Sequence, residues 1–330
     1  MTRRAQVVAV GTALPERRLT NADLEKMVDT NDEWIVSRTG IRERRVVEPG
    51  TPLSALAAPA AEECLRKAGV SAADIDGIIC ATITGDHVMP ATANLVQDRI
   101  GATKAWAYDI ANACNGFVAA LATASAFVSS GGADRILVIG GDVMSSVVDY
   151  TDRNTCILFG DGAGAVLVEA GEGDNGIRGF KLGSDGSFGK LLSIPCSGSA
   201  MRPSDEAVAA GAHFLKQEGR EVFQHAVRRM SQVATQLLEK LNLKADAIDL
   251  LVPHQANRRI IEPTARRLGL PMDKVVINIA NVANTTGGTI PLALASAEAD
   301  GRLTTGTRVM LVAFGGGFAW GACYLTWGRG

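Results

Sequence analysis

The chain has 330 residues, a length that predicts about two domains, and 47% hydrophobic with 21% charged residues is a composition typical of globular proteins. Its 33 Lys and Arg and 35 Asp and Glu residues leave a formal net charge of −2, so no global positive charge favours nucleic acid or an anionic membrane. The six cysteines contain no Cys-x-x-Cys pair, which argues against a disulfide framework or a zinc site and favours a reducing cytoplasm.

Two apolar stretches, 110–133 and 309–328, are long enough to span a bilayer. Asparagines and glycines interrupt the first stretch, and three consecutive glycines at 315–317 break the second, so both are expected inside a soluble fold. The apolar run after Arg3 lacks a clear cleavage site, and it predicts a β-strand rather than a signal peptide.

Short apolar runs alternate with longer helical patterns along the whole chain. In the first half, strands are predicted at 5–13, 75–83, 105–112, 135–141 and 162–170, and helices at 51–69, 91–100 and 114–130. In the second half, helices are predicted at 218–242 and 258–268, and strands at 248–253, 274–280, 308–314 and 318–326. Strands that are apolar at nearly every position indicate sheets covered by helices on both faces.

Segments of the first half recur in the second half at nearly constant spacing. Three pairs of segments are alike: 75–79 with 248–252, 109–112 with 278–281, and 135–139 with 308–312. The offsets are 173 residues (248 − 75 and 308 − 135) and 169 residues (278 − 109). This spacing predicts a duplication, with one similar half at 1–172 and the other at 173–330.

Three polar side chains are predicted to lie where a strand ends. Cys114 stands at the start of a small-residue helix, where the helix dipole is expected to lower the thiol pKa and enrich the reactive thiolate. His254 and Asn284 follow the predicted strands at 248–253 and 274–280, in the position where α/β proteins place their sites. Taken singly, each residue also has a purely structural interpretation: a buried unreactive cysteine, a hydrogen-bonded histidine without a catalytic role, and an asparagine in a turn.

Together, the segments around these residues resemble the β-ketoacyl-acyl-carrier-protein synthase III family of condensing enzymes. The resemblance rests on residues 30–44, 109–117, 160–164, 251–257, 284–286 and 313–321, and so it runs nearly end to end. It implies an α/β thiolase-like fold in which the two duplicated halves form a five-layer αβαβα sandwich. The half at 1–172 would carry the nucleophilic cysteine, and the half at 173–330 the histidine and the asparagine.

The resemblance also implies a reaction. A short-chain acyl-CoA such as acetyl-CoA would acylate Cys114, and malonyl-acyl carrier protein would then undergo decarboxylative condensation to a 3-ketoacyl-acyl carrier protein, initiating fatty-acid biosynthesis. The backbone N–H groups of Cys114 and Gly316 would form the oxyanion hole, and His254 with Asn284 would stabilise the enolate. No metal or other cofactor is expected, because decarboxylation would drive the reaction, and acyl-CoA would be a substrate. A cytoplasmic homodimer is implied.

Binding residues follow from the same resemblance. It assigns CoA binding to Trp34, Arg38, Arg153, Gly219, Phe223 and Asn257, the acyl pocket to Met89 from the partner subunit, and carrier-protein binding to Arg259 and Arg258. Two positions depart from the family pattern. Ala283 replaces the glycine that usually precedes the asparagine, and Gln224 replaces a basic residue often found on the carrier-docking helix.

Rival functions remain open. A specialised acyltransferase or ketide synthase of secondary metabolism would use the same three residues on a different acyl group. The order Cys, His, Asn also resembles that of papain-like hydrolases, although the chain lacks their Cys-Gly-[Ser/Ala]-Cys-[Trp/Tyr] segment.

Overall fold

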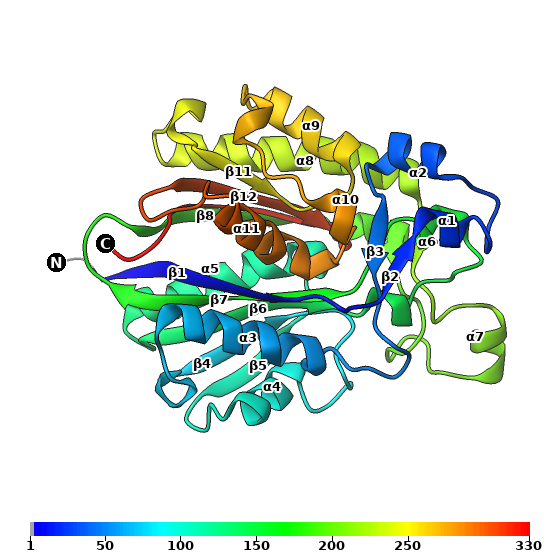
Figure 1. The fold of residues 1–330 in the computed structure, drawn as a ribbon, viewed down its shortest axis with the longest axis horizontal. Coiled ribbons are helices and arrows are strands. Elements are labelled where there is room, and N and C mark those ends of the chain that lie inside the picture. The colour runs from blue at the N-terminus through cyan, green and yellow to red at the C-terminus, as the bar shows by residue number, and fades with distance from the viewer. Residues whose placement is uncertain (1–2) are drawn as a thin grey trace.

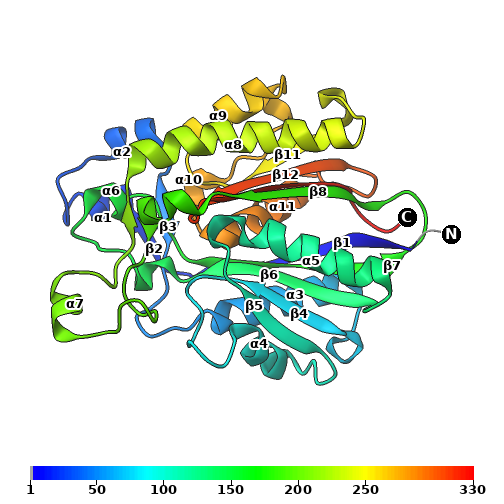
Figure 2. The same cartoon turned by 180° about the vertical axis from the view of Figure 1, so that it is seen from behind.

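A computed structural model describes residues 3–330 as alternating layers of helices and sheets (Figure 1). The outer layers are α8 (Gly219–Lys240) with α9 (Arg258–Arg267), and α3 (Ser54–Ala68) with α4 (Thr92–Ile100). Between the two sheets lie α5 (Gly116–Ser130) and α11 (Thr289–Ala299), as Figures 1 and 2 both show. The predicted five-layer αβαβα sandwich is therefore confirmed, while residues 1–2 of the predicted first half lie outside the described residues.

The first sheet has five strands in the order β1-β7-β6-β4-β5. Its strands are β1 (Arg4–Ala13), β4 (Gly77–Ala81), β5 (Trp106–Ile110), β6 (Arg135–Asp142) and β7 (Gly162–Gly171). β4 runs parallel to β5 and β6, whereas β7 is antiparallel to β1 and β6. All five strands were predicted, and β5 forms an edge of this sheet.

The second sheet has four strands in the order β11-β12-β13-β8. Its strands are β8 (Gly176–Ser184), β11 (Leu250–Pro253), β12 (Arg308–Gly315) and β13 (Ala319–Thr326). β8 was not predicted, because three glycines interrupt its apolar pattern. The strand predicted at 274–280 is wrong: it makes one isolated bridge, Leu251 to Val275, before the chain turns into α10 (Ile279–Val282).

The duplication is visible in the register of the parallel strands. Gly77 of β4 faces Ile136 of β6, and Leu250 of β11 faces Val309 of β12. Each residue of the second pair comes 173 residues after its counterpart (250 − 77 and 309 − 136). The first sheet is built from residues 4–171 and the second from 176–326, while a domain boundary at 172/173 stays a prediction.

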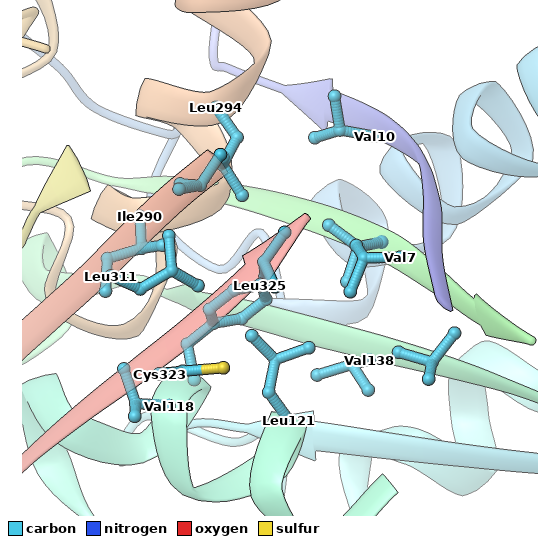
Figure 3. Close-up of a cluster of buried hydrophobic side chains, with 14 of the residues drawn as sticks. Val7, Val10, Val118, Leu121, Val138, Ile290, Leu294, Leu311, Cys323 and Leu325 are labelled. Carbon is cyan, nitrogen blue, oxygen red and sulfur yellow. The ribbon is translucent and has the colours of Figure 1, made fainter. Parts of the chain in front are cut away.

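The largest hydrophobic cluster joins the two halves (Figure 3). Val118 and Leu121 of α5 lie between strand residues of both sheets, such as Val138 of β6 and Leu311 of β12. Because α5 is apolar all round, it is suited to this central layer. Within residues 3–330 the single helical stretch long and apolar enough to cross a membrane is Ala113–Ser130, and 61% of it is buried here.

Smaller elements gather at the end of the molecule opposite the termini (Figure 1). They are β2 (Arg18–Thr20), α1 (Asn21–Leu24), α2 (Asp32–Thr39), β3 (Glu43–Arg45), α6 (Arg153–Cys156) and α7 (Asp205–Ala209). A short ribbon of β9 (Leu192–Ser193) and β10 (Lys216–Gln217) precedes α8.

Candidate active site

Cys114 lies on a tight turn between β5 and α5. The turn is a short 3-10 segment, Ala113–Asn115, and Ala113 adopts a left-handed backbone with φ of 44°. Gly315, at the end of β12, packs directly against this turn, since a Cβ at Gly315 would lie 2.6 Å from the backbone nitrogen of Cys114. The cysteine is therefore held between the start of α5 and the Gly315–Gly317 turn.

Burial controls the protonation of the Cys114 thiol. The residue is 8% exposed, and burial, together with the nearby Asp142 carboxylate, raises the pKa of the thiol to about 12. The sequence prediction of a lowered pKa is therefore wrong. A thiolate would lose its hydration here, and this cost outweighs the benefit expected from the helix N-terminus.

His254 follows β11 and is fully enclosed. Its backbone N–H donates to the Val312 carbonyl oxygen at 2.8 Å, so β12 fixes its position. Its Nδ1 atom lies 2.6 Å from the hydroxyl oxygen of Thr289, at the start of α11. Burial lowers the pKa of the imidazole to about 3, because the charged form would lose its hydration. His254 is therefore neutral at physiological pH.

Asn284 is fixed by its backbone and its side chain. Its backbone N–H donates to Leu158 O at 3.0 Å, and its carbonyl oxygen accepts from the Gly160 N–H at 3.1 Å. The Thr286 N–H donates to the side-chain Oδ1 at 2.9 Å, which leaves the Nδ2 amide as the free donor. Ala283, just before it, has φ of 56° and ψ of −159°, a conformation that strongly favours glycine.

The three predicted catalytic residues line one cavity of about 860 Å³. Gly315 and Gly316 line the same cavity as Cys114, so backbone N–H groups of that turn could donate hydrogen bonds to an oxyanion formed there. The cavity is mostly apolar. A nucleophile, a neutral imidazole and a primary amide thus converge on one enclosed space, which suits acyl transfer through a thioester.

Sequence reasoning missed Asp142, a buried carboxylate at the end of β6. Its oxygens accept hydrogen bonds from Thr82, Thr84 and Thr286 hydroxyls and from the backbone N–H groups of Ile83, Thr84 and Gly287. Burial raises the pKa of this carboxyl, and the hydrogen bonds oppose that shift. Asp142 thereby ties the end of β4 to the turn that carries Asn284. The sequence signal that could have identified Asp142 is its place at the end of an apolar strand.

Three of the predicted CoA-binding residues, Gly219, Phe223 and Asn257, line the cavity. Phe223 belongs to α8, and Asn257 caps α9 by accepting from the Arg259 N–H at 2.8 Å. The guanidinium of Arg259 lies over the Phe223 ring, 5.6 Å from its centroid. Arg258 is instead paired with Glu262 at 2.6 Å. Arg259 is thus placed between α9 and α8, whereas Arg258 packs against Gly40 at the end of α2.

The other predicted CoA-binding residues form a separate surface cluster. Trp34 of α2 lies beside Arg38 and Arg153, whose guanidinium carbons are 5.5 and 5.0 Å from its ring centroid. Arg153 also donates to the Asp29 carbonyl oxygen at 2.8 Å. The structure therefore brings these three residues together, although they are not among the described residues that line the cavity.

Met89 lies on the loop between β4 and α4 and is 85% exposed. Its neighbours His87 and Val88 line the cavity of their own chain. Met89 is not among those lining residues within 3–330, so its assignment to the partner subunit's acyl pocket stays a prediction.

Comparison with known proteins agrees with this geometry. Family models described as 3-oxoacyl-[acyl-carrier-protein] synthase III match residues 108–186, and residues 238–327 for its C-terminal part. A relative from Solibacter usitatus, named beta-ketoacyl-[acyl-carrier-protein] synthase III, is 48% identical over 98% of this chain and 99% of its own.

Solved structures give the same result. The 3-oxoacyl-[acyl-carrier-protein] synthase III of Aquifex aeolicus has a TM-score of 0.91 at 41% identity, covering 98% of this chain and 100% of its own. A priming β-ketosynthase of the R1128 polyketide pathway has a TM-score of 0.92 at 32% identity, covering 99% and 97%. The chain therefore belongs to the β-ketoacyl-[acyl-carrier-protein] synthase III family of condensing enzymes.

Proposed function

We propose that this protein condenses a short-chain acyl-CoA with malonyl-acyl carrier protein, releasing CO₂ and forming the 3-ketoacyl-acyl carrier protein that begins fatty-acid synthesis. The observation that carries the proposal is the convergence of Cys114, His254 and Asn284 on one cavity, in a chain of this family. A papain-like hydrolase is not proposed, because the family and the fold are those of condensing enzymes.

In the first half-reaction the Cys114 sulfur attacks the thioester carbon of the acyl-CoA. The negative charge that develops on the carbonyl oxygen is stabilised by the backbone N–H groups of Cys114 and Gly316. The carbon–sulfur bond to CoA breaks, and the thiol proton of Cys114 leaves with the CoA sulfur. Because burial raises the pKa of the thiol, the proton stays on the Cys114 sulfur until that sulfur attacks the thioester.

In the second half-reaction the malonyl thioester occupies the same cavity. His254 Nε2 and Asn284 Nδ2 donate hydrogen bonds to its thioester oxygen, and the carbon–carbon bond to the carboxylate breaks with release of CO₂. The resulting enolate carbon attacks the acyl-Cys114 thioester, and the cysteine sulfur departs as a thiolate, which takes one proton from water to restore the thiol. Loss of CO₂ drives the reaction, so neither a metal nor a redox cofactor is required.

The CoA part of the substrate would contact two groups of residues, the surface cluster around Trp34 and the lining of the cavity. Trp34 and Arg153 are suited to enclose the adenine of CoA, with Arg38 near its phosphates, since guanidinium and indole groups both stack on aromatic rings. Gly219, Phe223 and Asn257 line the part of the cavity that would hold the pantetheine arm.

The carrier protein would dock on the basic surface at α9. Arg259 and Arg258, with Arg266 and Arg267 about two turns further along, favour an acidic partner by electrostatic steering. Gln224 supplies no charge there. We therefore expect carrier binding to depend mainly on Arg259, because Arg258 is already paired with Glu262.

The proposed assembly is a cytoplasmic homodimer. The edge strand β5 supports this proposal, since all five of its residues are only partly buried, and two of them, Trp106 and Tyr108, stack with ring centroids 5.4 Å apart. The loop residues Val88 and Met89, 98% and 85% exposed, belong to the same half of the chain. Pairing of two β5 edges would cover this surface.

A second candidate is a priming ketosynthase of secondary metabolism that uses a larger acyl group. The cavity of about 860 Å³ and the likeness to the R1128 priming β-ketosynthase favour it. The two functions are separated by incubating the protein with malonyl-acyl carrier protein and acetyl-, isobutyryl-, octanoyl- or benzoyl-CoA and identifying the 3-ketoacyl product by mass spectrometry. Preference for acetyl- or isobutyryl-CoA supports the first function, preference for octanoyl- or benzoyl-CoA supports the second, and absence of any product refutes both.

A further inference from the structure

The hydroxyl of Thr289 touches the imidazole of His254 on the side away from the substrate. Its Oγ1 atom lies 2.6 Å from His254 Nδ1 and 3.0 Å from the carbonyl oxygen of Thr286. Thr289 is fully buried at the start of α11, so these contacts lie away from bulk solvent. His254 Nε2, in contrast, makes no hydrogen bond within residues 3–330, although the residue lines the cavity.

A threonine hydroxyl carries one proton, so it can donate to only one of these two neighbours. If the proton goes to Thr286 O, His254 Nδ1 must itself be protonated to donate to Thr289, and Nε2 presents a lone pair to the cavity. If the proton goes to Nδ1, then Nδ1 is the acceptor and Nε2 carries the imidazole proton. His254 is neutral, because burial lowers its pKa to about 3, so these two states exclude each other.

The neighbours of Thr286 favour the second state. The Thr286 carbonyl oxygen already accepts the backbone N–H of Thr289, so it is satisfied without the hydroxyl. The contact of the Thr289 hydroxyl with Nδ1 is also shorter than its contact with Thr286 O. An unprotonated Nδ1 needs a donor, and the Thr289 hydroxyl is its one hydrogen-bond partner within residues 3–330.

We propose that Thr289 is a positioning residue that donates its hydroxyl proton to Nδ1 of His254 and thereby keeps Nε2 protonated and ready to donate to the substrate. The inference deepens the proposed function and rests on it for its chemical consequence. It makes His254 a hydrogen-bond donor in decarboxylation and excludes it as the base that deprotonates Cys114.

The same turn organises the second donor. The Thr286 N–H holds Asn284 Oδ1 at 2.9 Å, and the Thr286 hydroxyl is bound to the Asp142 carboxylate. Residues 284–289 therefore present both donors, the Asn284 amide through Thr286 and the His254 imidazole through Thr289. Both would act on a single oxygen, as a decarboxylating thioester requires.

The direct test is nitrogen NMR of the whole protein with ¹⁵N-labelled histidine, which reads which ring nitrogen carries the proton. The chain has four histidines, and the His254→Asn variant identifies the resonances of His254. We expect Nε2 of His254 to be protonated and Nδ1 to be an acceptor, without any substrate present. A protonated Nδ1 in the wild-type protein would overturn the proposal whether or not the protein condenses anything.

Variants supply a second readout. Thr289→Val removes the hydroxyl at nearly constant shape, Thr289→Ser retains it, and Thr285→Val removes a buried hydroxyl of the same turn that has no partner within residues 3–330. Acylation of Cys114 by acyl-CoA and its discharge by malonyl-acyl carrier protein are timed separately by intact mass.

We expect Thr289→Val to slow discharge roughly 10- to 100-fold, because a donor misplaced by about 1 Å loses up to about 10²-fold in rate. Acylation should stay within about threefold of wild type, and both Thr289→Ser and Thr285→Val should discharge at nearly the wild-type rate. Equal slowing of acylation and discharge by Thr289→Val would assign His254 a base role and contradict the proposal. Failure of the wild-type protein to discharge would refute the proposed function instead, and the NMR result would still decide the tautomer.

Discussion

Gly315 provides the sharpest test of how the oxyanion hole is assembled. Its φ is not in the left-handed region, so alanine can adopt this backbone, and the only obstacle is the space. A Cβ would lie 2.6 Å from the backbone nitrogen of Cys114 and 3.1 Å from its Cβ. Ordinary contact begins near 3.4 Å, so Cys114 and Gly315 must separate by about 0.8 Å.

Such a displacement falls on the N–H group that we assign to the oxyanion. A misplacement of about 1 Å costs about 10²-fold, and loss of one oxyanion donor costs about 10²- to 10³-fold. We therefore expect Gly315→Ala to acylate Cys114 roughly 100-fold more slowly than wild type and to lose about 1–3 kcal/mol of stability through overpacking.

The assay is the rate of acyl-adduct formation by intact mass under single-turnover conditions, with a thermal melt to show that the variant is folded. Gly189→Ala is the matched control, because its Cβ would meet only the Gly317 carbonyl oxygen at 3.6 Å, an ordinary contact. A folded Gly315→Ala protein that is acylated at the wild-type rate would refute the assignment of this N–H group.

Three further predictions concern the residues around the cavity. Because burial raises the pKa of Cys114 to about 12, its alkylation by iodoacetamide should rise about tenfold per pH unit from pH 7 to 10; a plateau below pH 9 would show a lowered pKa. Ala283→Gly should leave the free energy of unfolding in urea unchanged or raised, because relief of about 1–3 kcal/mol of backbone strain offsets the loss of the buried methyl group. The control Ala120→Gly lies within a helix and should lose about 1–2 kcal/mol in the same denaturation. Asp142→Asn should lose about 3 kcal/mol or more in the same denaturation, because an amide cannot accept from all of its donors; a loss below 1 kcal/mol would contradict the network.

Much of the fold followed from local pattern. Strand β6 was predictable because burial on both faces leaves a short, continuous apolar run. Helix α8 was predictable because burial of one stripe leaves apolar residues at helical spacing. Strand β8 was missed, because glycines hide its alternation of apolar and polar residues. The segment 274–280 was wrongly predicted as a strand, because its apolar pattern does not show that it makes only one isolated bridge. Here the strand partners, rather than local propensity, decide the structure.

The site divides in the same way. The meeting of Cys114, His254 and Asn284 in one cavity could be predicted, because each stands in a family motif at the end of an apolar run. Asp142 and Thr289 could not, because their roles depend on contacts across the fold, such as Thr286 with Asp142, 144 residues apart. The thiol pKa of Cys114 was predicted in the wrong direction for the same reason: the helix start is visible in the sequence, whereas its burial depends on the packed structure.

The central claim is that Cys114 carries the acyl group between two substrates. Intact-protein mass spectrometry of wild type and Cys114→Ala tests it most directly, after incubation with acetyl-CoA and then with malonyl-acyl carrier protein. The account predicts one acetyl adduct on wild type, none on Cys114→Ala, and loss of the adduct as a 3-ketoacyl-acyl carrier protein appears. An adduct on both proteins, or condensation by Cys114→Ala at the wild-type rate, would contradict it.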